Sequence, residues 1–325
     1  MKAEVRIAEL TDDDVPAVVA LCRTALDLPE DAAEAADIVR RLRERTGTEG
    51  WAAQPRRLAG VAAFAPGGRL IGVALGSMSS RGPSTGHVDL VAVDPERRRR
   101  GIGRALAARI EGALAEMGAG AVEVAGNAPY YAWPGIDVRY TPAVCAAMAL
   151  GYEFQQTAWN MTADLTRPDA PGLRPTAAAE RRLEDRGITV RRATPDDLPA
   201  LVEFARATFS AGWAGEIIHS VGPNRAGCHL AVAGGEILGF AAYGSSRSSW
   251  FGPMGTAPAA QGTGIGSVLL RRCLADQKAA GHDRVQIGWV GPVPFYSATV
   301  GARIERVFVR YRKQLYGDEP AIRAN

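Results

Sequence analysis

The amino-acid sequence contains an internal repeat, and this repeat limits the folds open to the chain more than any other feature. Residues 188–202, ITVRRATPDDLPALV, closely match residues 5–19, VRIAELTDDDVPAVV. A self-match at a spacing of about 180 residues indicates two copies of one domain rather than one large domain. The length of 325 residues is also suited to two domains of about 150 residues each.

Each copy contains a glycine-rich stretch that follows a predicted strand. Residues 88–106 read VDLVAVDPERRRRGIGRAL, and residues 250–269 read WFGPMGTAPAAQGTGIGSVL. Gly101 and Gly103 each cost about 1 kcal/mol relative to alanine inside a helix. Arginines just before a helix amino terminus also oppose the helix dipole. Both features become favourable if a phosphate binds there, because glycine lets backbone N–H groups approach its oxygens. Two such stretches therefore predict two phosphate-binding turns.

Other phosphate-binding motifs do not fit these stretches. In the Rossmann fingerprint the glycines directly follow a strand, and an acidic residue ends the next strand. Here a proline-containing spacer separates strand from glycines, and neither Glu123 nor Asp283 ends its strand. A P-loop needs Gly-Lys-Ser/Thr, which both stretches lack.

Composition and charge exclude further classes of function. The net charge is only +3, and no basic stretch with interleaved aromatic residues is present, so we expect no nucleic acid partner. The four cysteines and four histidines form no metal-binding spacing, so we expect no metal. No apolar run approaches the length of a membrane span, and the amino terminus lacks a signal-type apolar region. We expect no membrane partner and a cytoplasmic protein.

The hydrophobic pattern predicts the same order of elements in each copy. In the first copy we expect strands near residues 5–10, 58–64, 70–78, 87–93 and 121–125, with closing strands within 152–165. Helices are expected near residues 11–26, 31–45, 101–117 and 142–150. This order predicts the α/β (α+β) class, with two tandem domains that are each a mixed, mainly antiparallel sheet flanked by helices. We place the first copy at residues 1–165, a linker at 166–187 and the second copy at 188–325.

The residues around the glycines carry a resemblance to a known family. Val93-x-Pro95 followed by Arg98-x-x-Gly101-x-Gly103 and a helix resembles the acyl-CoA-binding motif of the GCN5-related N-acetyltransferase (GNAT) family. The second copy has a similar motif at residues 258–266, PAAQGTGIG. The resemblance covers nearly the whole chain except the linker. It implies a tandem member of the family, with a fourth strand that splays from the fifth in each domain.

The resemblance also implies acetyl-CoA (coenzyme A) as the ligand of the glycine turns. Its pantetheine arm would enter between the splayed strands and pair with backbone groups of Val91 and Val93, or of Met254 and Thr256. The residues implied to hold the pyrophosphate are Arg98, Arg99, Arg100, Gly101, Ile102, Gly103 and Arg104 in the first copy, and Gln261, Gly262, Thr263, Gly264, Ile265, Gly266 and Ser267 in the second.

Acetyl transfer to an amine requires proton movements as well as binding. A primary amine must lose a proton before it attacks the thioester, and the departing thiolate is better if it gains one. The family often uses a carboxylate as base and a tyrosine as acid. The resemblance implies Tyr296 as the acid, although it lies one residue further from Gly301 than the commonest spacing; an aromatic that packs under the sheet is the alternative. The first copy offers Asp89 as a candidate base.

An aromatic segment inserted after the fifth strand, residues 127–140, reads NAPYYAWPGIDVRY. Its large and polar side chains are candidates for binding the acceptor: Tyr130, Tyr131, Trp133, Asp137 and Tyr140. The same side chains could instead pack on the other copy, and the sequence favours neither interpretation.

We therefore predict an acetyl-CoA-dependent N-acetyltransferase. Its acceptor is expected to be the primary amine of a small molecule, such as an amino sugar, a polyamine or an amino-acid-like compound, which attacks the thioester directly. The alternatives are a non-catalytic CoA-binding or sensor module, and an acetyltransferase for a protein amine. We expect both copies to bind CoA and one to carry the chemistry. The sequence leaves open whether the protein is a monomer or a homodimer.

Overall fold

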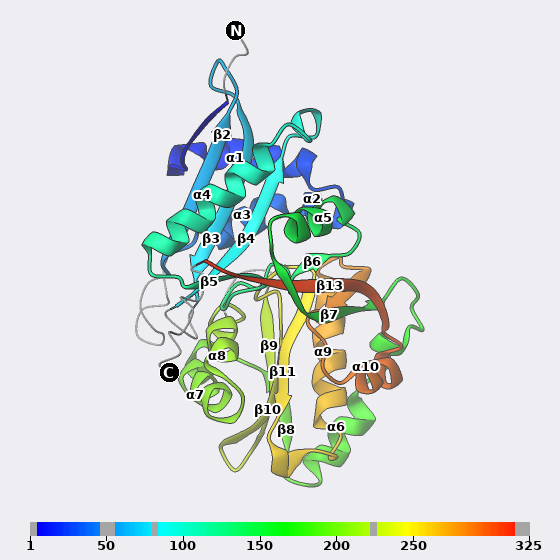
Figure 1. The fold of residues 1–325 in the computed structure, drawn as a ribbon. Coiled ribbons are helices and arrows are strands. Elements are labelled where there is room, and N and C mark those ends of the chain that lie inside the picture. Colours follow the sequence, from blue (N-terminus) through cyan, green and yellow to red (C-terminus); the bar gives the residue numbers. More distant parts are fainter. Residues whose placement is uncertain (1–4, 46–55, 80–83, 222–225, 316–325) are drawn as a thin grey trace, which may run out of the picture.

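The computed structural model describes residues 5–45, 56–79, 84–221 and 226–315 (Figure 1). The first copy contains β1 (Arg6–Glu9), α1 (Val15–Ala25), α2 (Pro29–Ala33), α3 (Ala35–Arg43), β2 (Leu58–Phe64), β3 (Leu70–Met78), β4 (Thr85–Val93), α4 (Ile102–Glu116), β5 (Ala121–Val124), β6 (Ile136–Asp137), α5 (Thr141–Ala149) and β7 (Glu153–Asp164). The linker contains α6 (Ala177–Glu184). The second copy contains β8 (Thr189–Arg192), α7 (Leu198–Thr208), α8 (Ala211–Ile218), β9 (Gly227–Ala233), β10 (Glu236–Tyr243), β11 (Trp250–Thr256), α9 (Ile265–Ala279), β12 (Arg284–Ile287), α10 (Val293–Val300) and β13 (Arg303–Gln314).

The strands of the described residues join into one sheet. Their order is β1-β2-β3-β4-β5-β13-β7-β12-β11-β10-β9-β8, with the short β6 paired to β13 off this path. The pairs β4–β5 and β11–β12 are parallel, and the other pairs are antiparallel. The predicted class, a mixed and mainly antiparallel sheet flanked by helices, is confirmed.

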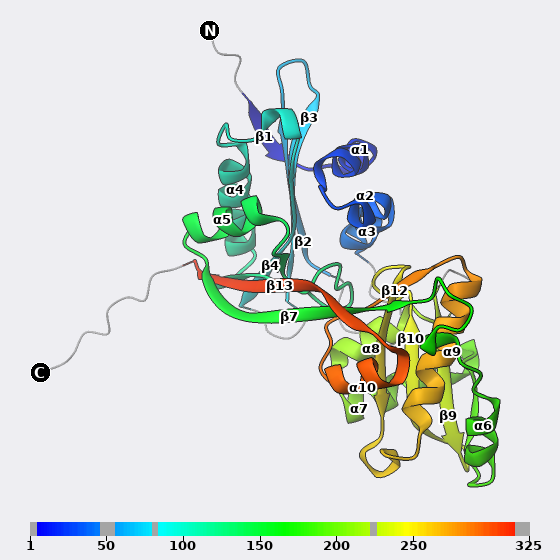
Figure 2. The same ribbon diagram turned by 90° about the vertical axis from the view of Figure 1, so that its right-hand side faces the viewer.

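The last strand of each copy pairs with the fifth strand of the other copy. β13 pairs with β5, and β7 pairs with β12. β7 and β13 also pair with each other, and they cross from one half of the molecule to the other (Figure 2). Residues 152–165 therefore hold one twelve-residue strand rather than the two closing strands that we expected. The second closing strand that we expected within residues 152–165 is replaced by β13, which comes from the other end of the chain and pairs with β7. The boundaries of the two copies and the linker stay a prediction.

Helices cover both faces of the sheet in each copy. In the first copy α4 and α5 lie on one side of β2–β4, and α1, α2 and α3 lie on the other (Figure 2). All nine residues of β3 are buried as a result, which is typical of a strand covered on both faces. α3 buries Ala35, Ile38, Val39 and Leu42, the spacing of an amphipathic helix.

The chain entry into α1 repeats at α7. The Asp14 carboxylate accepts hydrogen bonds from the backbone N–H of Thr11 at 2.9 Å and from its hydroxyl at 2.7 Å. Asp197 makes the same pair of bonds with Thr194 at 2.8 and 2.9 Å. The helix expected at residues 31–45 is instead two helices, because the backbone leaves helical geometry at Glu34, where φ is −93° and ψ is 7°.

Among the helices that the structure describes, none is both long and apolar enough to cross a lipid bilayer.

Candidate active site

The glycine turn before α4 has an unusual backbone conformation. Arg99 and Gly101 have φ angles of 62° and 84°, and Gly101 is the residue that caps the amino terminus of α4. The second copy follows the same path, with φ of 76° at Gly262 and 93° at Gly264. Glycine adopts positive φ without the steric cost that other residues bear. Arg99 also has a positive φ, but its side chain makes this conformation costly. Such strained positions are typical of functional sites.

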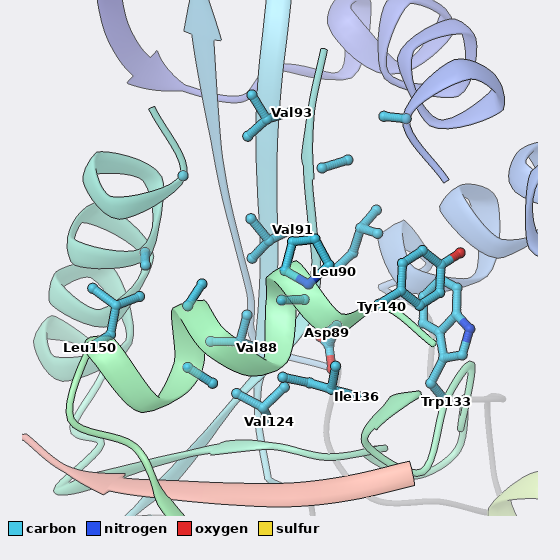
Figure 3. Close-up of a pocket in the computed structure, with 18 of the residues that line it drawn as sticks. Val88, Asp89, Leu90, Val91, Val93, Val124, Trp133, Ile136, Tyr140 and Leu150 are labelled. Atoms are coloured by element: carbon cyan, nitrogen blue, oxygen red, sulfur yellow. The ribbon is translucent and has the colours of Figure 1, made fainter. Parts of the chain in front are cut away.

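A cavity of about 710 Å³ opens beside this turn, and every residue that lines it belongs to the first copy. β4 and β5 pair only from Thr85 to His87 on the β4 side. Beyond that point the two strands separate, and residues 88–93 of β4 line the cavity. Figure 3 shows Val88, Leu90, Val91 and Val93 along β4, with α5 crossing in front of the strand. The splayed strand pair is thus an open cleft in the first copy.

The residues predicted to bind CoA in the first copy mostly line this cavity. Those that do are Val91, Val93, Arg98, Arg99, Gly101, Ile102, Gly103 and Arg104, whereas Arg100 is exposed and is not part of the lining. Val91 is 42% exposed although it lies on a central strand. A Cβ placed on Gly103 would meet only Val93 Cγ2, at 3.9 Å. The cleft walls therefore leave room for an extended chain, and the residues present fit a bound CoA.

The Arg98 side chain makes hydrogen bonds within the first copy. Its guanidinium donates to the carbonyl oxygen of Ala25 at 2.7 Å and to both carboxylate oxygens of Asp27 at 3.1 Å. It also donates to the carbonyl oxygen of Val93 at 3.3 Å. These bonds attach the glycine turn to the end of α1, so Arg98 holds the shape of the cleft mouth.

In the second copy, side chains of β11 and α10 lie beside the equivalent glycine, Gly266. A Cβ on Gly266 would lie 3.4 Å from both Met254 Cε and the Phe295 ring. The other residues predicted to bind CoA in the second copy lie on β11 and around the start of α9. They are Thr256, Gln261, Gly262, Thr263, Gly264, Ile265 and Ser267. None of these residues lines the 710 Å³ cavity. The Thr263 hydroxyl donates to the carbonyl oxygen of Ala260 at 2.6 Å, within its own turn.

Asp89 lies half-buried on β4 and lines the cavity (Figure 3). Its Oδ2 atom is buried and has no hydrogen-bond partner among the described residues. Burial raises the pKa of Asp89 above its usual range; the charges of Arg56 and His87 and a hydrogen bond with the Ser77 side chain offset this only in part. A carboxylate with a raised pKa and a free oxygen is suited to accept a proton.

The side chains of the aromatic segment divide between the cavity of the first copy and contacts with the second copy, the two alternatives that the sequence left open. Trp133 and Tyr140 line the cavity, and each donates to Asp31 Oδ2 at 3.1 Å. Tyr131 instead packs edge-on against Trp289 of the second copy, with ring centroids 5.6 Å apart. Tyr130 does both, because it lines the cavity and its hydroxyl lies 3.4 Å from His219 Nδ1 of the second copy.

Asp137 lines the cavity but its carboxylate is already paired. Arg139 and Arg306 donate to it, with the shortest distance to each at 2.8 and 2.7 Å. Burial alone would raise the pKa of Asp137, but these arginines lower it below its usual value. The side chain is better suited to holding the wall of the cavity than to taking a proton from an acceptor.

Tyr296 lies in the hydrophobic core of the second copy. It is 7% exposed, its ring packs edge-on against Phe251 and Phe295, and it is not part of the cavity lining. Burial raises the pKa of its hydroxyl well above the usual value. This position counts against the predicted role as proton donor, because a catalytic acid must reach the reacting atoms. The Tyr296 side chain therefore matches the alternative that the sequence left open, an aromatic packed in the core.

Two features of the site are not apparent from the sequence pattern. Asp31 comes from a helix more than ninety residues before the aromatic segment, so no local pattern links the two. Ala143, Cys145 and Ala146 of α5 also line the cavity. Their small size lets α5 lie across the cleft, and no local motif marks them.

The splayed parallel strands, the glycine turn at a helix start and the repetition of both in one chain define a tandem acyltransferase architecture. The Acetyltransferase (GNAT) family model matches residues 25–131 and 194–296, one region in each copy. These regions span more than half of the chain, so the chain belongs to this family. Its members are N-acetyltransferases that use acetyl-CoA.

Solved structures share the tandem fold at low sequence identity. The tandem GNAT protein from the clavulanic acid biosynthesis pathway has 19% identity and a TM-score of 0.67, with 96% of this chain and 98% of that chain covered. A GCN5-related N-acetyltransferase from Sphaerobacter thermophilus has 20% identity and a TM-score of 0.62, with 95% of each chain covered.

A third similar structure is the glucosamine N-acetyltransferase region of a fungal multi-domain β-N-acetylglucosaminidase. It has 16% identity and a TM-score of 0.72; the match covers 96% of this chain but only 38% of that one. At these identities the likeness shows the fold alone. Among curated proteins, none matches the chain.

Proposed function

We propose that the protein transfers an acetyl group from acetyl-CoA to a primary amine of a small molecule, and that the first copy carries the chemistry. One observation carries this proposal. The cavity beside the glycine turn contains Asp89, a carboxylate with a raised pKa whose Oδ2 atom has no hydrogen-bond partner in the described part of the chain. A binding module would need the turn but would have no use for such a base. The acceptor would be an amino sugar, a polyamine or an amino-acid-like compound.

The turn and β4 would bind the cosubstrate. Acetyl-CoA supplies the reactive thioester when bound. Backbone N–H groups between Arg99 and Arg104 would hold the pyrophosphate, with the positive end of the α4 dipole behind them. Backbone groups of Val91 and Val93 would pair with the pantetheine arm, in the stretch where β4 has lost its pairing with β5.

Asp89 would take the proton that an ammonium acceptor must lose. Its raised pKa makes it a stronger base than an exposed aspartate, and the free Oδ2 atom gives the proton a place to go. Direct attack by the neutral amine on the thioester then forms the amide and releases the thiol. We assign no acid, because the candidate Tyr296 lies in the core of the other copy.

The second copy would support the first rather than catalyse. Phe295 and Met254 stand where the pantetheine arm would pass beside Gly266. The earlier expectation of two CoA sites is therefore replaced by a proposal of one. A sensor function and a protein acceptor stay as alternatives, and the experiment below separates them.

Release of the CoA thiol, measured with a chromogenic thiol reagent, tests the proposal. Glucosamine is the first acceptor to try, since one similar fold is a glucosamine N-acetyltransferase region; spermidine, lysine and a lysine-containing peptide follow. Turnover of a small amine that is abolished by Asp89→Asn supports the proposal. Tight acetyl-CoA binding without turnover of any acceptor indicates a sensor, and turnover of the peptide alone indicates a protein acceptor.

A further inference from the structure

A buried carboxylate links the cavity of the first copy to the second copy. Asp31, on α2, is fully buried. Its Oδ2 atom accepts hydrogen bonds from Trp133 Nε1 and from the Tyr140 hydroxyl, each at 3.1 Å. Trp133 and Tyr140 both line the cavity. Figure 3 shows the two rings side by side, on the side of β4 where the α1–α3 helices lie and away from α4.

Two arginines of the second copy hold this carboxylate. Arg247, between β10 and β11, donates from Nη1 to Asp31 Oδ1 at 2.6 Å. Arg306, on β13, donates to Oδ1 at 3.0 Å and to Oδ2 at 2.9 Å. The side chains of Arg247 and Arg306 are only 1% and 2% exposed. From the residues that the structure describes, Asp31 therefore receives five hydrogen bonds, and three of them come from the second copy.

Further contacts fix the arginines themselves. Arg247 also donates to the carboxylate of Glu34 and to the carbonyl oxygen of Glu30. Arg306 also donates to Asp137 at 2.7 Å, and Asp137 lines the cavity as well. Each guanidinium thus bridges two acidic side chains of the first copy, which places it in one geometry. Bidentate arginine–carboxylate contacts of this kind are specific in orientation as well as in charge.

The charge state of Asp31 determines how the two rings are oriented. Burial alone would raise its pKa, but Arg247 and Arg306 outweigh burial and the pKa lies at about 2. An ionised carboxylate only accepts hydrogen bonds. The Trp133 N–H and the Tyr140 O–H must therefore both point at it, which fixes the orientation of the two rings at the cavity wall.

We propose that Arg247 and Arg306 of the second copy are positioning residues for the acceptor, acting through Asp31 on the Trp133 and Tyr140 wall of the first copy's cavity. The inference rests on the proposed function. The pyrophosphate turn lies at the start of α4, whereas this wall is attached to α2 on the opposite face of the sheet (Figure 2). The wall is accordingly at the acceptor end of the cavity, and the second copy contributes to specificity without contacting substrate.

Steady-state kinetics of Arg247→Gln and Arg306→Gln test this role. We expect the KM of the amine probe that the wild type turns over best, among glucosamine, spermidine and lysine, to rise about tenfold, since small displacements of positioning groups have effects of this size or larger. The KM for acetyl-CoA should stay within about twofold of wild type. Arg247→Lys, which keeps the charge but loses the forked geometry, should give an intermediate value.

Arg272→Gln is the matched control. Arg272 also belongs to the second copy and forms a two-bond ion pair with Glu180, at 2.8 and 2.6 Å, between α9 and α6. Its loss removes an arginine–carboxylate ion pair of the second copy that does not involve Asp31 and is more exposed, with side chains 29% and 17% exposed. We expect both KM values to be unchanged in this variant. A similar rise in the acceptor KM here would mean that any loss of stability in the second copy affects the cavity, and it would overturn the proposal.

A spectroscopic measurement gives an answer that does not depend on turnover. The fluorescence of Trp133 is obtained by subtracting the spectrum of a Trp133→Phe variant in the same background. Arg306→Gln is the cleaner variant here, because the Arg247 guanidinium lies 5.9 Å from the Trp133 ring and affects its emission directly. We expect the Trp133 emission to move to longer wavelength and to become more accessible to acrylamide.

The outcomes separate this inference from the proposed function. If no amine probe is acetylated by the wild type, the proposed function fails, and the fluorescence result still decides whether the second copy positions the wall. An unchanged Trp133 signal in Arg306→Gln overturns the inference. An acceptor KM and an acetyl-CoA KM that rise together also overturn it. If the Gln variants fail to fold, Arg306→Lys, which keeps the charge but loses the forked geometry, provides both measurements.

Discussion

The Phe295 ring lies against Gly266, so that a Cβ on this glycine would be 3.4 Å from the ring. Gly103, the equivalent residue of the first copy, faces only Val93 Cγ2, at 3.9 Å from such a Cβ. The two glycine turns otherwise share their backbone conformation, with φ of 84° at Gly101 and 93° at Gly264. The copies therefore differ in the space beside the turn rather than in the turn itself.

This difference predicts one acetyl-CoA site per chain. Gly101→Glu should abolish binding, because a carboxylate at the turn repels the pyrophosphate and a non-glycine residue at positive φ is strained by about 1 kcal/mol or more. Gly264→Glu is a matched control with the same strain, since neither glycine has any atom within 4 Å of an added Cβ. Isothermal calorimetry should give one equivalent for wild type and Gly264→Glu. Two equivalents in the wild type would contradict this prediction.

The turn conformation and the order of elements followed from local sequence, and both could be predicted. Glycine spacing, capping residues and strand periodicity act over a few residues, so they are visible in the chain itself. The Phe295 contact could not be predicted in this way, because it depends on how α10 packs against α9. The burial of Tyr296 could not be predicted either, because the sequence was consistent with both a proton donor and an aromatic side chain packed under the sheet.

Asp89→Asn should lower kcat by a factor of about 10²–10⁴, the usual contribution of a general base. In the wild type, kcat/KM should rise with pH through the raised pKa of Asp89 as the carboxylate becomes deprotonated. This limb of the pH profile should be absent in the variant. A pH profile that is the same in both proteins would remove Asp89 as the base. Ser77→Ala is not a suitable control, because the Ser77 side chain hydrogen-bonds to the same carboxylate.

The same substitution should increase stability at neutral pH. A carboxyl group whose pKa is raised in the folded state binds protons more tightly there than in the unfolded chain. Its contribution to the free energy of unfolding is therefore lost as pH rises from the unfolded pKa through the folded pKa. Asparagine is neutral, so the substitution removes the cost of burying an ionised carboxylate. Urea unfolding at pH 7 should show Asp89→Asn to be more stable than wild type, and a loss of stability would mean that the carboxylate is paired rather than strained.

Asp31 should show the opposite dependence on pH. Its folded pKa of about 2 lies below the unfolded value, so its stabilisation is complete above about pH 4 and is lost as pH falls through the folded pKa. Asp31→Asn leaves two buried arginines without a full partner and should destabilise the protein by about 3–5 kcal/mol at pH 7. Unfolding curves between pH 2 and pH 7 measure both effects.

Asp169→Asn provides the control for Asp31. Asp169 pairs with Arg167 at 2.7 Å, but both side chains are largely exposed, so the substitution should leave the unfolding free energy nearly unchanged. If Asp31→Asn were equally mild, the carboxylate would not be the link between the two copies that its five hydrogen bonds indicate.

Tyr296→Phe should leave kcat and both KM values within about twofold of wild type. The hydroxyl lies in the core of the second copy, away from the cavity that contains Asp89. The sequence predicted a loss of turnover, because the resemblance placed a tyrosine acid near this position. Steady-state assays with acetyl-CoA and an amine acceptor measure the difference. A large fall in kcat without a change in the acetyl-CoA KM would restore Tyr296 as the acid.

The contacts between the copies could not be predicted from the sequence. Arg247 and Arg306 lie more than 200 residues from Asp31 in the chain, and β13 exchanges its place with β7. Strand pairing at such separations depends on the packing of the whole molecule, which local propensity does not encode. The aromatic segment was ambiguous for the same reason. Its residues divide between the cavity and the second copy, as Trp133 and Tyr131 illustrate.

A crystal structure of the protein with bound acetyl-CoA tests the central claim most directly. We expect the pantetheine arm between β4 and β5 of the first copy, the pyrophosphate at the backbone of residues 99–104, and the thioester near Asp89. We expect no ligand beside Gly266, where Phe295 stands. Acetyl-CoA bound between β11 and β12 instead, with the first cavity empty, would contradict the assignment of the chemistry to the first copy.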